Sequence, residues 1–145
     1  MEIEITDNRL RMIFSGHQDC EDRVEFLSHS VGALRKFLGR YPLPFFTEIV
    51  KNIWDHADGR GRILIVKYTI SSGDFFLFSA RDEGKESYSF MDHIHNSRLR
   101  GNGVNFGRGL DLIDDFGKDL CVRLYISTEK GFHYSGIVRS IGFFA

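Results

Sequence analysis

Three groups of polar residues and glycines could together form a ligand-binding site, and the first lies between positions 48 and 56. Glu48, Asn52 and His56 follow one another at intervals of four residues. Because four residues advance an α-helix by about 400°, these side chains form one polar stripe. A wide apolar face that includes Ile49 and Ile53 runs beside it. The pattern indicates a helix whose polar stripe borders a pocket; the ordinary alternative is the solvated face of an amphipathic helix.

The second group contains Asp82 and Gly84, and it follows the apolar run 75–80. An acid at the end of a strand can face a cleft, and a nearby glycine lets a flat ligand approach the backbone. The ordinary alternative is a β-turn in which Asp and Gly take their usual positions.

The third group is the glycine-rich run 101–109, which ends in Gly107-Arg108-Gly109 before a short amphipathic segment. Glycines ahead of a helix expose backbone N–H groups at its positive end, an arrangement that suits phosphates. The alternative is a flexible loop that leads into a helix.

In this order, the three groups resemble the conserved boxes of the GHKL (histidine-kinase-like) ATPase family. The pattern Glu48-x-x-x-Asn52 is similar to its N box, Asp82-x-Gly84 to its G1 box and Gly107-x-Gly109 to its G2 box. A hairpin and a polar loop stand between the groups, where the family has two strands and its ATP lid. The resemblance covers nearly the whole chain.

The resemblance implies that ATP and Mg²⁺ are the cofactors. Asn52 would ligate the Mg²⁺ that bridges the phosphates, and Glu48 would act as the general base or orient the nucleophile. Phosphoryl transfer depends mainly on positioning, a metal ion and stabilisation of charge, so these roles are chemically coherent.

The same resemblance assigns the remaining contacts with the nucleotide. Asp82 would accept a hydrogen bond from the exocyclic amine of adenine, and Gly84 would keep the base site open. Gly107 and Gly109 would bring backbone amides to the phosphates.

The chain departs from the family pattern at three places. Lys85-Glu86 stands where the G1 box usually continues to a second glycine, and Phe132 follows Gly131 where the family often has threonine. Ile53 stands where the family commonly has alanine, which predicts a repacked floor under the nucleotide.

The elements that must position these residues follow from periodicity, glycines and prolines. They predict one domain over residues 1–145, an α+β two-layer sandwich with helices on one face of a mixed, mostly antiparallel sheet. The resemblance implies the Bergerat-type ATP-binding fold with a polar ATP lid. The expected elements are strands at 10–14, 62–70, 75–80, 120–126 and 132–141, helices at 24–38 and 43–57, a short helix from about 109, and a loop at 86–105.

Composition narrows the class of protein. Lys and Arg number 19 against 20 for Asp and Glu, a balance that gives no reason to expect nucleic acid as a partner. Neither a signal peptide nor a membrane span is evident, and Cys20 and Cys121 are typical of reduced thiols, so we expect a cytoplasmic protein. His93 and His95 lack a third metal ligand at a suitable spacing, and exposed histidines are the preferred interpretation.

Within the family, this length is similar to that of stand-alone anti-sigma factors that are also serine kinases. The leading hypothesis is therefore an ATP-dependent serine/threonine protein kinase that binds a sigma factor and phosphorylates a small antagonist protein. One alternative is a non-catalytic interaction module of the same fold. Another is a small ATPase subunit that pairs with a second chain, and a homodimer stays open.

Overall fold

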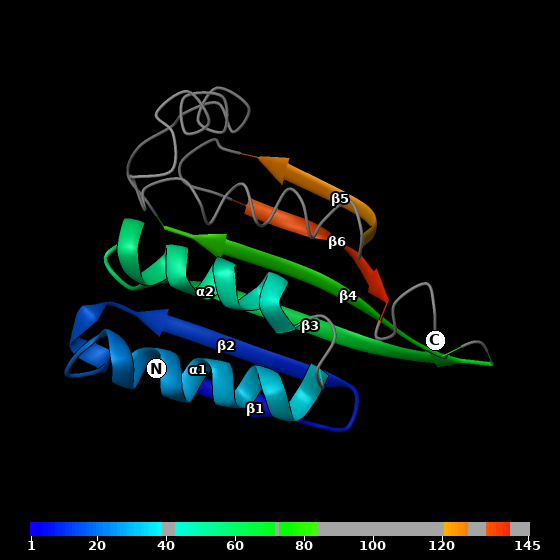
Figure 1. Ribbon diagram of the computed structural model, residues 1–145, viewed down its shortest axis with the longest axis horizontal. Helices are drawn as coiled ribbons and strands as arrows, with labels where there is room; N and C mark the ends of the chain where they lie inside the picture. The colour runs from blue at the N-terminus through cyan, green and yellow to red at the C-terminus, as the bar shows by residue number, and fades with distance from the viewer. Residues whose placement is uncertain (39–42, 72, 84–120, 128–132, 140–145) are drawn as a thin grey trace.

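The computed structural model describes residues 1–38, 43–71, 73–83, 121–127 and 133–139 (Figure 1). The expected loop at 86–105 and the short helix from about 109 lie outside these residues. The strands are β1 (Glu2–Ile5), β2 (Arg9–Ser15), β3 (Arg60–Ile70), β4 (Gly73–Asp82), β5 (Cys121–Ser127) and β6 (His133–Arg139). The helices are the 3-10 turn η1 (His17–Asp19), α1 (Arg23–Leu38) and α2 (Leu43–His56).

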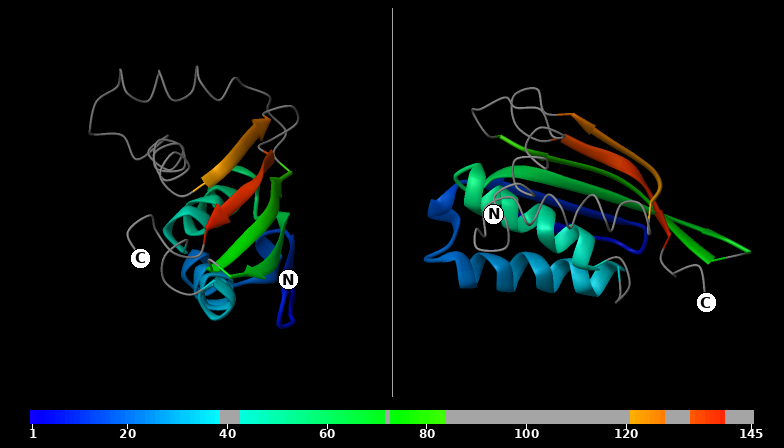
Figure 2. Two further views of the ribbon diagram at one scale, coloured as in Figure 1. Left: turned by 90° about the vertical axis from the view of Figure 1, so that its right-hand side faces the viewer. Right: turned by 45° about the horizontal axis from the view of Figure 1, so that its top comes forward.

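The strands form one six-stranded sheet in the order β1-β2-β3-β4-β6-β5. Helices α1 and α2 cover one face of this sheet (Figures 1 and 2). The α+β class and the two-layer arrangement are therefore confirmed. Every strand pair in the described part of the chain is antiparallel. The mostly antiparallel character expected from the sequence is confirmed, and these strands include no parallel pair that would make the sheet mixed.

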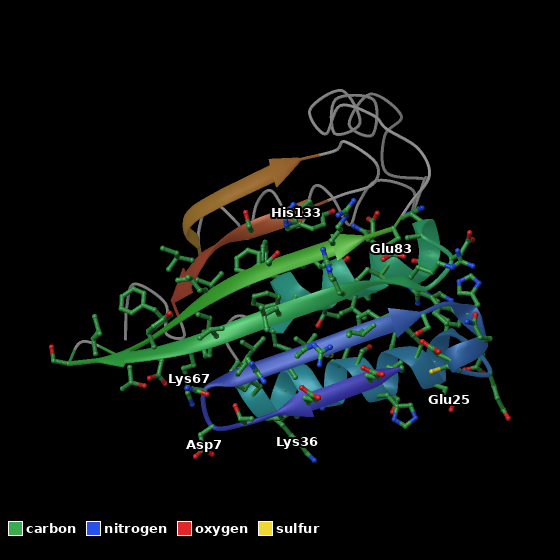
Figure 3. All side chains as sticks on the ribbon, turned by 180° about the vertical axis from the view of Figure 1, so that it is seen from behind. Asp7, Glu25, Lys36, Lys67, Glu83 and His133 are labelled. Atoms are coloured by element: carbon green, nitrogen blue, oxygen red, sulfur yellow. The ribbon has the colours of Figure 1, made fainter. Side chains whose placement is uncertain are left out.

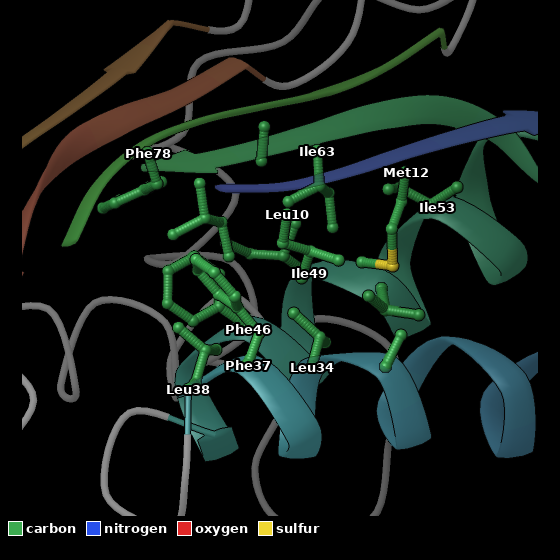
Figure 4. Packing of buried hydrophobic residues seen from close by; sticks show 14 of the residues in the cluster. Leu10, Met12, Leu34, Phe37, Leu38, Phe46, Ile49, Ile53, Ile63 and Phe78 are labelled. Carbon is green, nitrogen blue, oxygen red and sulfur yellow. The ribbon is translucent and has the colours of Figure 1, made fainter. Parts of the chain in front are cut away.

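The hydrophobic core lies between the sheet and the two helices (Figure 4). Alternate residues of β2, such as Leu10 and Met12, are fully buried, because successive side chains of a strand point to opposite faces. Phe45 and Phe46 of α2 each meet the ring of Phe78 edge-on, with centroids 5.4 and 5.1 Å apart. Edge-to-face pairs contribute about 0.5–1.5 kcal/mol each beyond the area they bury. These contacts fix α2 over the centre of the sheet.

A tight turn ends α2 and leads directly into β3. The N–H of Gly59 donates to the carbonyl of Ile53 at 3.0 Å, and Asp58 and Gly59 have φ values of 53° and 72°. The same carbonyl also accepts from the Ala57 N–H at 3.2 Å, so this left-handed C-terminal cap adds a second hydrogen bond at the end of the helix. The ring of His17 lies 2.9 Å from the carbonyl oxygen of Trp54, another of the last carbonyls. The helix predicted at 43–57 is thus confirmed and ends one residue earlier, at His56.

The sequence did not predict β1 or η1, which fasten the N-terminus to the sheet. The Met1 amino group lies 3.0 Å from a carboxylate oxygen of Asp19, and the Ser15 N–H donates to the other oxygen at 2.7 Å. Burial tends to raise the pKa of Asp19, but these hydrogen bonds and the positive terminus outweigh it, so the pKa lies below its ordinary value. The described helices include none long and apolar enough to cross a membrane.

Candidate functional site

Two residues that the sequence singles out, Asn52 and Asp82, are buried polar side chains. They are 7% and 3% exposed, and Ser30 is the third buried polar residue in the described part of the chain. The Ser30 hydroxyl donates to the carbonyl of Phe26 at 2.6 Å, an ordinary contact inside a helix. Asn52 lies in α2 and Asp82 ends β4, and a buried polar side chain costs free energy unless its polar atoms are hydrogen-bonded.

Both residues lie at the same end of the molecule. Asp82 is the last residue of β4, on the same sheet face as the buried Ala80, and its partner across the ladder is Gly61 of β3. Ile53, next to Asn52 in α2, packs onto Gly61. The end of α2 therefore lies beside the end of β4, as Figure 1 shows. Asn52 and Asp82 therefore lie on neighbouring elements at this end of the fold, and their joint use of a ligand stays a prediction.

The Asn52 amide is a buried polar group whose hydrogen bonding the described residues do not satisfy. Its Nδ2 atom is buried and has no hydrogen-bond partner among the described residues. An unsatisfied buried amide costs about 1–3 kcal/mol, so such a group calls for an explanation. A half-turn of the amide exchanges its nitrogen and oxygen, so an oxygen can occupy the same place.

The residues present fit Mg²⁺ only when it arrives with phosphates. The described residues include no group of three or more His, Cys, Asp or Glu that could hold a metal. Mg²⁺ prefers oxygen ligands and is commonly bound through one or two protein groups together with substrate phosphates and water. The Asn52 amide would supply one such oxygen, and a triphosphate would supply others.

Glu48 lies one helical turn before Asn52 and is already engaged. Its carboxylate is 14% exposed and accepts a hydrogen bond from Lys51 Nζ at 3.2 Å. Nearby, Arg23 donates to both oxygens of Asp55 at 2.9 and 3.0 Å. These hydrogen bonds raise the pKa of Arg23, and the negative charge of Glu48 adds to the effect. Glu48 thus belongs to a charged network between α1 and α2.

Ile53 fills the space that a smaller residue would leave open. It is fully buried, and its Cδ1 and Cγ1 atoms lie 3.1 Å from the point where a Cβ atom on Gly61 would stand. Ile53 therefore packs against Gly61, a neighbour that local sequence does not reveal, and the repacked floor beneath a nucleotide stays a prediction. The other predicted contacts, Gly84, Gly107 and Gly109, lie outside the described residues, as do Lys85, Glu86 and Phe132.

A second polar region, on the other face of the sheet, was not recognised from the sequence. The Ser79 hydroxyl lies 3.0 Å from His133 Nε2, and Arg62 and Arg81 are directly opposite each other on β3 and β4. Burial lowers the pKa of His133, and the charges of Arg81 and Arg62 lower it further. A depression of about 290 Å³ opens beside Ser79. The signal was present as arginines at alternate strand positions, but only the register brings them together.

In comparisons with known proteins, no protein-family model matches the chain, and the search of curated proteins finds no similar one. The residues and their geometry therefore carry the functional argument.

Proposed function

We propose that the chain binds ATP with Mg²⁺ and acts as a regulatory serine/threonine protein kinase of the stand-alone anti-sigma factor type, with the Bergerat-type fold. The observation that carries the proposal is the buried Asn52 amide, which lacks a partner among the described residues and lies at the end of the molecule that holds Asp82. A ligand with phosphates and an amine would use both groups.

The two side chains offer complementary chemistry to one nucleotide. A carboxylate accepts hydrogen bonds, so Asp82 suits the exocyclic amine of adenine. An amide oxygen is a hard ligand, so Asn52 suits a magnesium ion held by phosphates. When bound, Mg²⁺ would neutralise the charge that develops on the transferred phosphoryl group.

Glu48 is the candidate base for the protein hydroxyl that receives the phosphoryl group. Its position one turn from Asn52 would place it beside the nucleophile. The hydroxyl would compete with Lys51 for the carboxylate, because Lys51 Nζ lies only 3.2 Å away. In this proposal the substrate is a small antagonist protein and a sigma factor is the regulated partner.

Titration calorimetry with Mg²⁺ and ATP tests the nucleotide site directly. Asp82→Asn places an amide donor against the adenine amine, so we expect binding to weaken by about 1–3 kcal/mol. Asp74→Asn is the matched control, since Asp74 lies near the opposite end of the same strand and accepts a hydrogen bond from Thr69 at 2.7 Å. No saturation of the wild-type protein by millimolar nucleotide would exclude the proposal.

A non-catalytic interaction module of the same fold is the second candidate. Two observations favour it: Ile53 packs tightly against Gly61, and the carboxylate of Glu48 is held by Lys51. The first narrows the floor expected beneath a nucleotide, and the second occupies the proposed base. Two results would favour the module. In one, the protein binds nucleotide but transfers no phosphoryl group to any candidate partner. In the other, the folded protein binds a partner but no nucleotide.

A further inference from the structure

The face of the sheet opposite α1 and α2 has the features of a docking surface. We call it the open face; it is formed by the outward residues of β2, β3, β4 and β6, and no described helix covers it. Figure 3 looks onto this face, with the strands in front of the helices and His133 near its upper edge. Its residues take no part in the proposed nucleotide site, since Asn52 and Asp82 lie on the helix side.

One end of the open face is strongly basic. Arg62 of β3 lies directly opposite Arg81 of β4, and Arg81 lies directly opposite His133 of β6. Like charges at directly opposed positions of a sheet are unfavourable. In the described part of the chain, neither Arg62 nor Arg81 forms an ion pair. Two arginines therefore occupy opposed positions of β3 and β4, and no acid among the described residues forms an ion pair with either.

On the neighbouring strands β1 and β2, a glutamate pairs with two arginines. Glu4 of β1 lies 3.2 Å from Arg11 and 4.0 Å from Arg9, which are both on β2. Acid–arginine pairing is thus already part of this sheet, and it stops at β2. A carboxylate from another molecule would extend the same pairing to β3 and β4.

The other end of the open face carries exposed apolar residues, with Arg9 of β2 opposite Val66 and Arg139 of β6 opposite Phe75. Of the six exposed large hydrophobic residues in the described part of the chain, four lie here: Leu64, Leu77, Tyr68 and Ile70, at 40, 43, 52 and 54% exposure. They belong to β3 and β4, the strands that also carry Arg62 and Arg81. Exposed apolar residues gathered on one face, beside polar ones, mark interaction sites.

A depression lies where Arg62 and Leu64 adjoin on the open face. It has a volume of about 290 Å³, and its lining includes Arg11, Arg62, Leu64 and Ser79. It combines guanidinium groups with an aliphatic wall, so it can hold a side chain that is apolar along its length and acidic at its tip. The depression gives the surface a place in which one partner residue can be anchored.

We propose that the open face binds an acidic, amphipathic segment of a partner protein, with the carboxylates on Arg62 and Arg81 and the apolar side chains on Leu64, Leu77 and Tyr68. Charge complementarity selects this occupant. Arginine beside apolar side chains is typical of protein interfaces. Single-stranded nucleic acid would instead need several aromatic platforms beside the arginines; here Leu64 and Ile13 flank Arg62, and His133 is the aromatic ring opposite Arg81.

The spacing along β3 sets the order of groups in the partner. Outward residues two apart in a strand are separated by about 6.6 Å. The outward residues of β3 change from Arg62 through Leu64 and Tyr68 to Ile70. Arg9, which stands opposite Val66, lies 4.0 Å from Glu4. The matching segment carries its acidic residues at one end and its apolar residues at the other.

The test uses the full chain and a labelled synthetic peptide with a glutamate-rich half and a half of leucine and phenylalanine. We expect the peptide to bind the wild-type protein at low salt and more weakly as salt increases. Arg62→Glu with Arg81→Glu should weaken binding by about tenfold or more, because two attractive charges become repulsive. The double variant Arg62→Gln with Arg81→Gln should lose less affinity for the peptide. Its fold no longer contains the repulsion between the two arginines.

Matched controls lie on the helix layer. Arg35→Glu with Lys36→Glu makes the same change of net charge at exposed positions of α1. Leu77→Ser is compared with Val24→Ser, since Val24 is 76% exposed on α1. Loss of binding in the open-face variants but not in the α1 variants would support the proposal. ATP titration of the same variants should be unchanged, which separates this surface from the nucleotide site.

Four results would overturn the proposal. The first is that the acidic peptide does not bind the wild-type protein at low salt, and the second is that the α1 controls lose as much binding as the open-face variants. The third is that a single-stranded oligonucleotide binds the same arginines more tightly than the peptide does. The fourth is that the protein sediments as a dimer and that Leu64→Ser or Leu77→Ser abolishes this dimer. The third would identify a nucleic-acid surface, and the fourth would show that a second copy of the chain occupies the face.

Discussion

The side chain of Ile53 packs directly onto Gly61, so that α2 approaches β3 at a position with no side chain of its own. A Cβ atom on Gly61 would stand 3.1 Å from two carbons of Ile53 and 2.5 Å from the carbonyl oxygen of Arg81. Gly61 also faces Asp82 across the ladder. The large and small residues therefore form a matched pair that sets the depth of α2 over the region of the candidate site.

Gly61→Ala should destabilise the fold by about 1–3 kcal/mol, because the added carbon overpacks a filled space. Ile53→Val in the same background should recover only part of the loss, since the contact with the Arg81 carbonyl remains. Denaturant unfolding of the single and double variants measures this. Fully additive effects would mean that Ile53 and Gly61 are not coupled.

Gly59→Ala should destabilise the fold by about 1–3 kcal/mol, because alanine resists a positive φ. Gly59 has φ 72°, and an added Cβ atom would lie 3.0 Å from backbone atoms of Gly16 and His17. Gly32→Ala is the matched control: Gly32 lies inside α1, and an added Cβ atom would meet nothing within 4 Å. That variant should stabilise the fold by about 0.5–1 kcal/mol. Thermal melts of both proteins should therefore shift in opposite directions.

Glu48→Ala should leave nucleotide binding nearly intact and lower phosphotransfer by about 10² to 10⁴, the usual effect of a lost general base. Asn52→Ala should lose Mg²⁺-dependent binding as well as turnover. Titration and single-turnover transfer to a candidate partner distinguish the two variants. Equal losses of binding would show that Glu48 has a structural or metal-binding role, in agreement with its ion pair to Lys51.

In Asp19→Asn, the free energy of unfolding should change less as the pH is lowered into the acid range. The pKa of Asp19 is lowered from 3.8 in the folded state, so its stabilising effect is present above that value and is lost as pH falls through the folded pKa. The variant should be less stable at neutral pH and should lose less on acidification. Asp7→Asn, at an exposed position, is the control. Parallel acid unfolding curves for wild type and Asp19→Asn would contradict the assignment.

Arg81→Gln should raise the pKa of His133 part of the way to its ordinary value, because burial, the larger cause of the shift, remains. In the wild-type protein the lowered pKa means that the unfolded chain binds a proton more readily, so this group lowers stability as pH falls below 6.5. NMR titration of the histidine ring measures the shift. Arg60→Gln, on the same face of β3, should leave it almost unchanged.

Periodicity predicted most of the described elements because their buried faces are continuous. Alternation in β3 and the helical spacing in α1 follow directly from the core they face. β1 was missed because its alternating Glu and Ile residues span only Glu2–Ile5, too short a run to indicate a strand without its partner β2. The pairing of β1 with β2 is a feature of the tertiary structure.

The candidate site was predictable in its residue types but not in its neighbours. The spacing of Asn52 and Asp82 within their elements indicated where each would lie. The packing of Ile53 on Gly61 and the row formed by Arg62, Arg81 and His133 depend on strand register, which no local pattern contains. The Glu48–Lys51 pair, three residues apart on one helix, could have been recognised from the sequence.

The position of β1 at one side of the sheet also bears on aggregation. In the described part of the sheet, β1 is an outermost strand, and such a strand presents unpaired backbone groups that can template pairing with another chain. β1 is only four residues long, and Glu2 and Glu4 place negative charge on alternate positions. A second chain adding its own β1 alongside would bring like charges together. The acids of β1 therefore discourage edge-to-edge polymerisation.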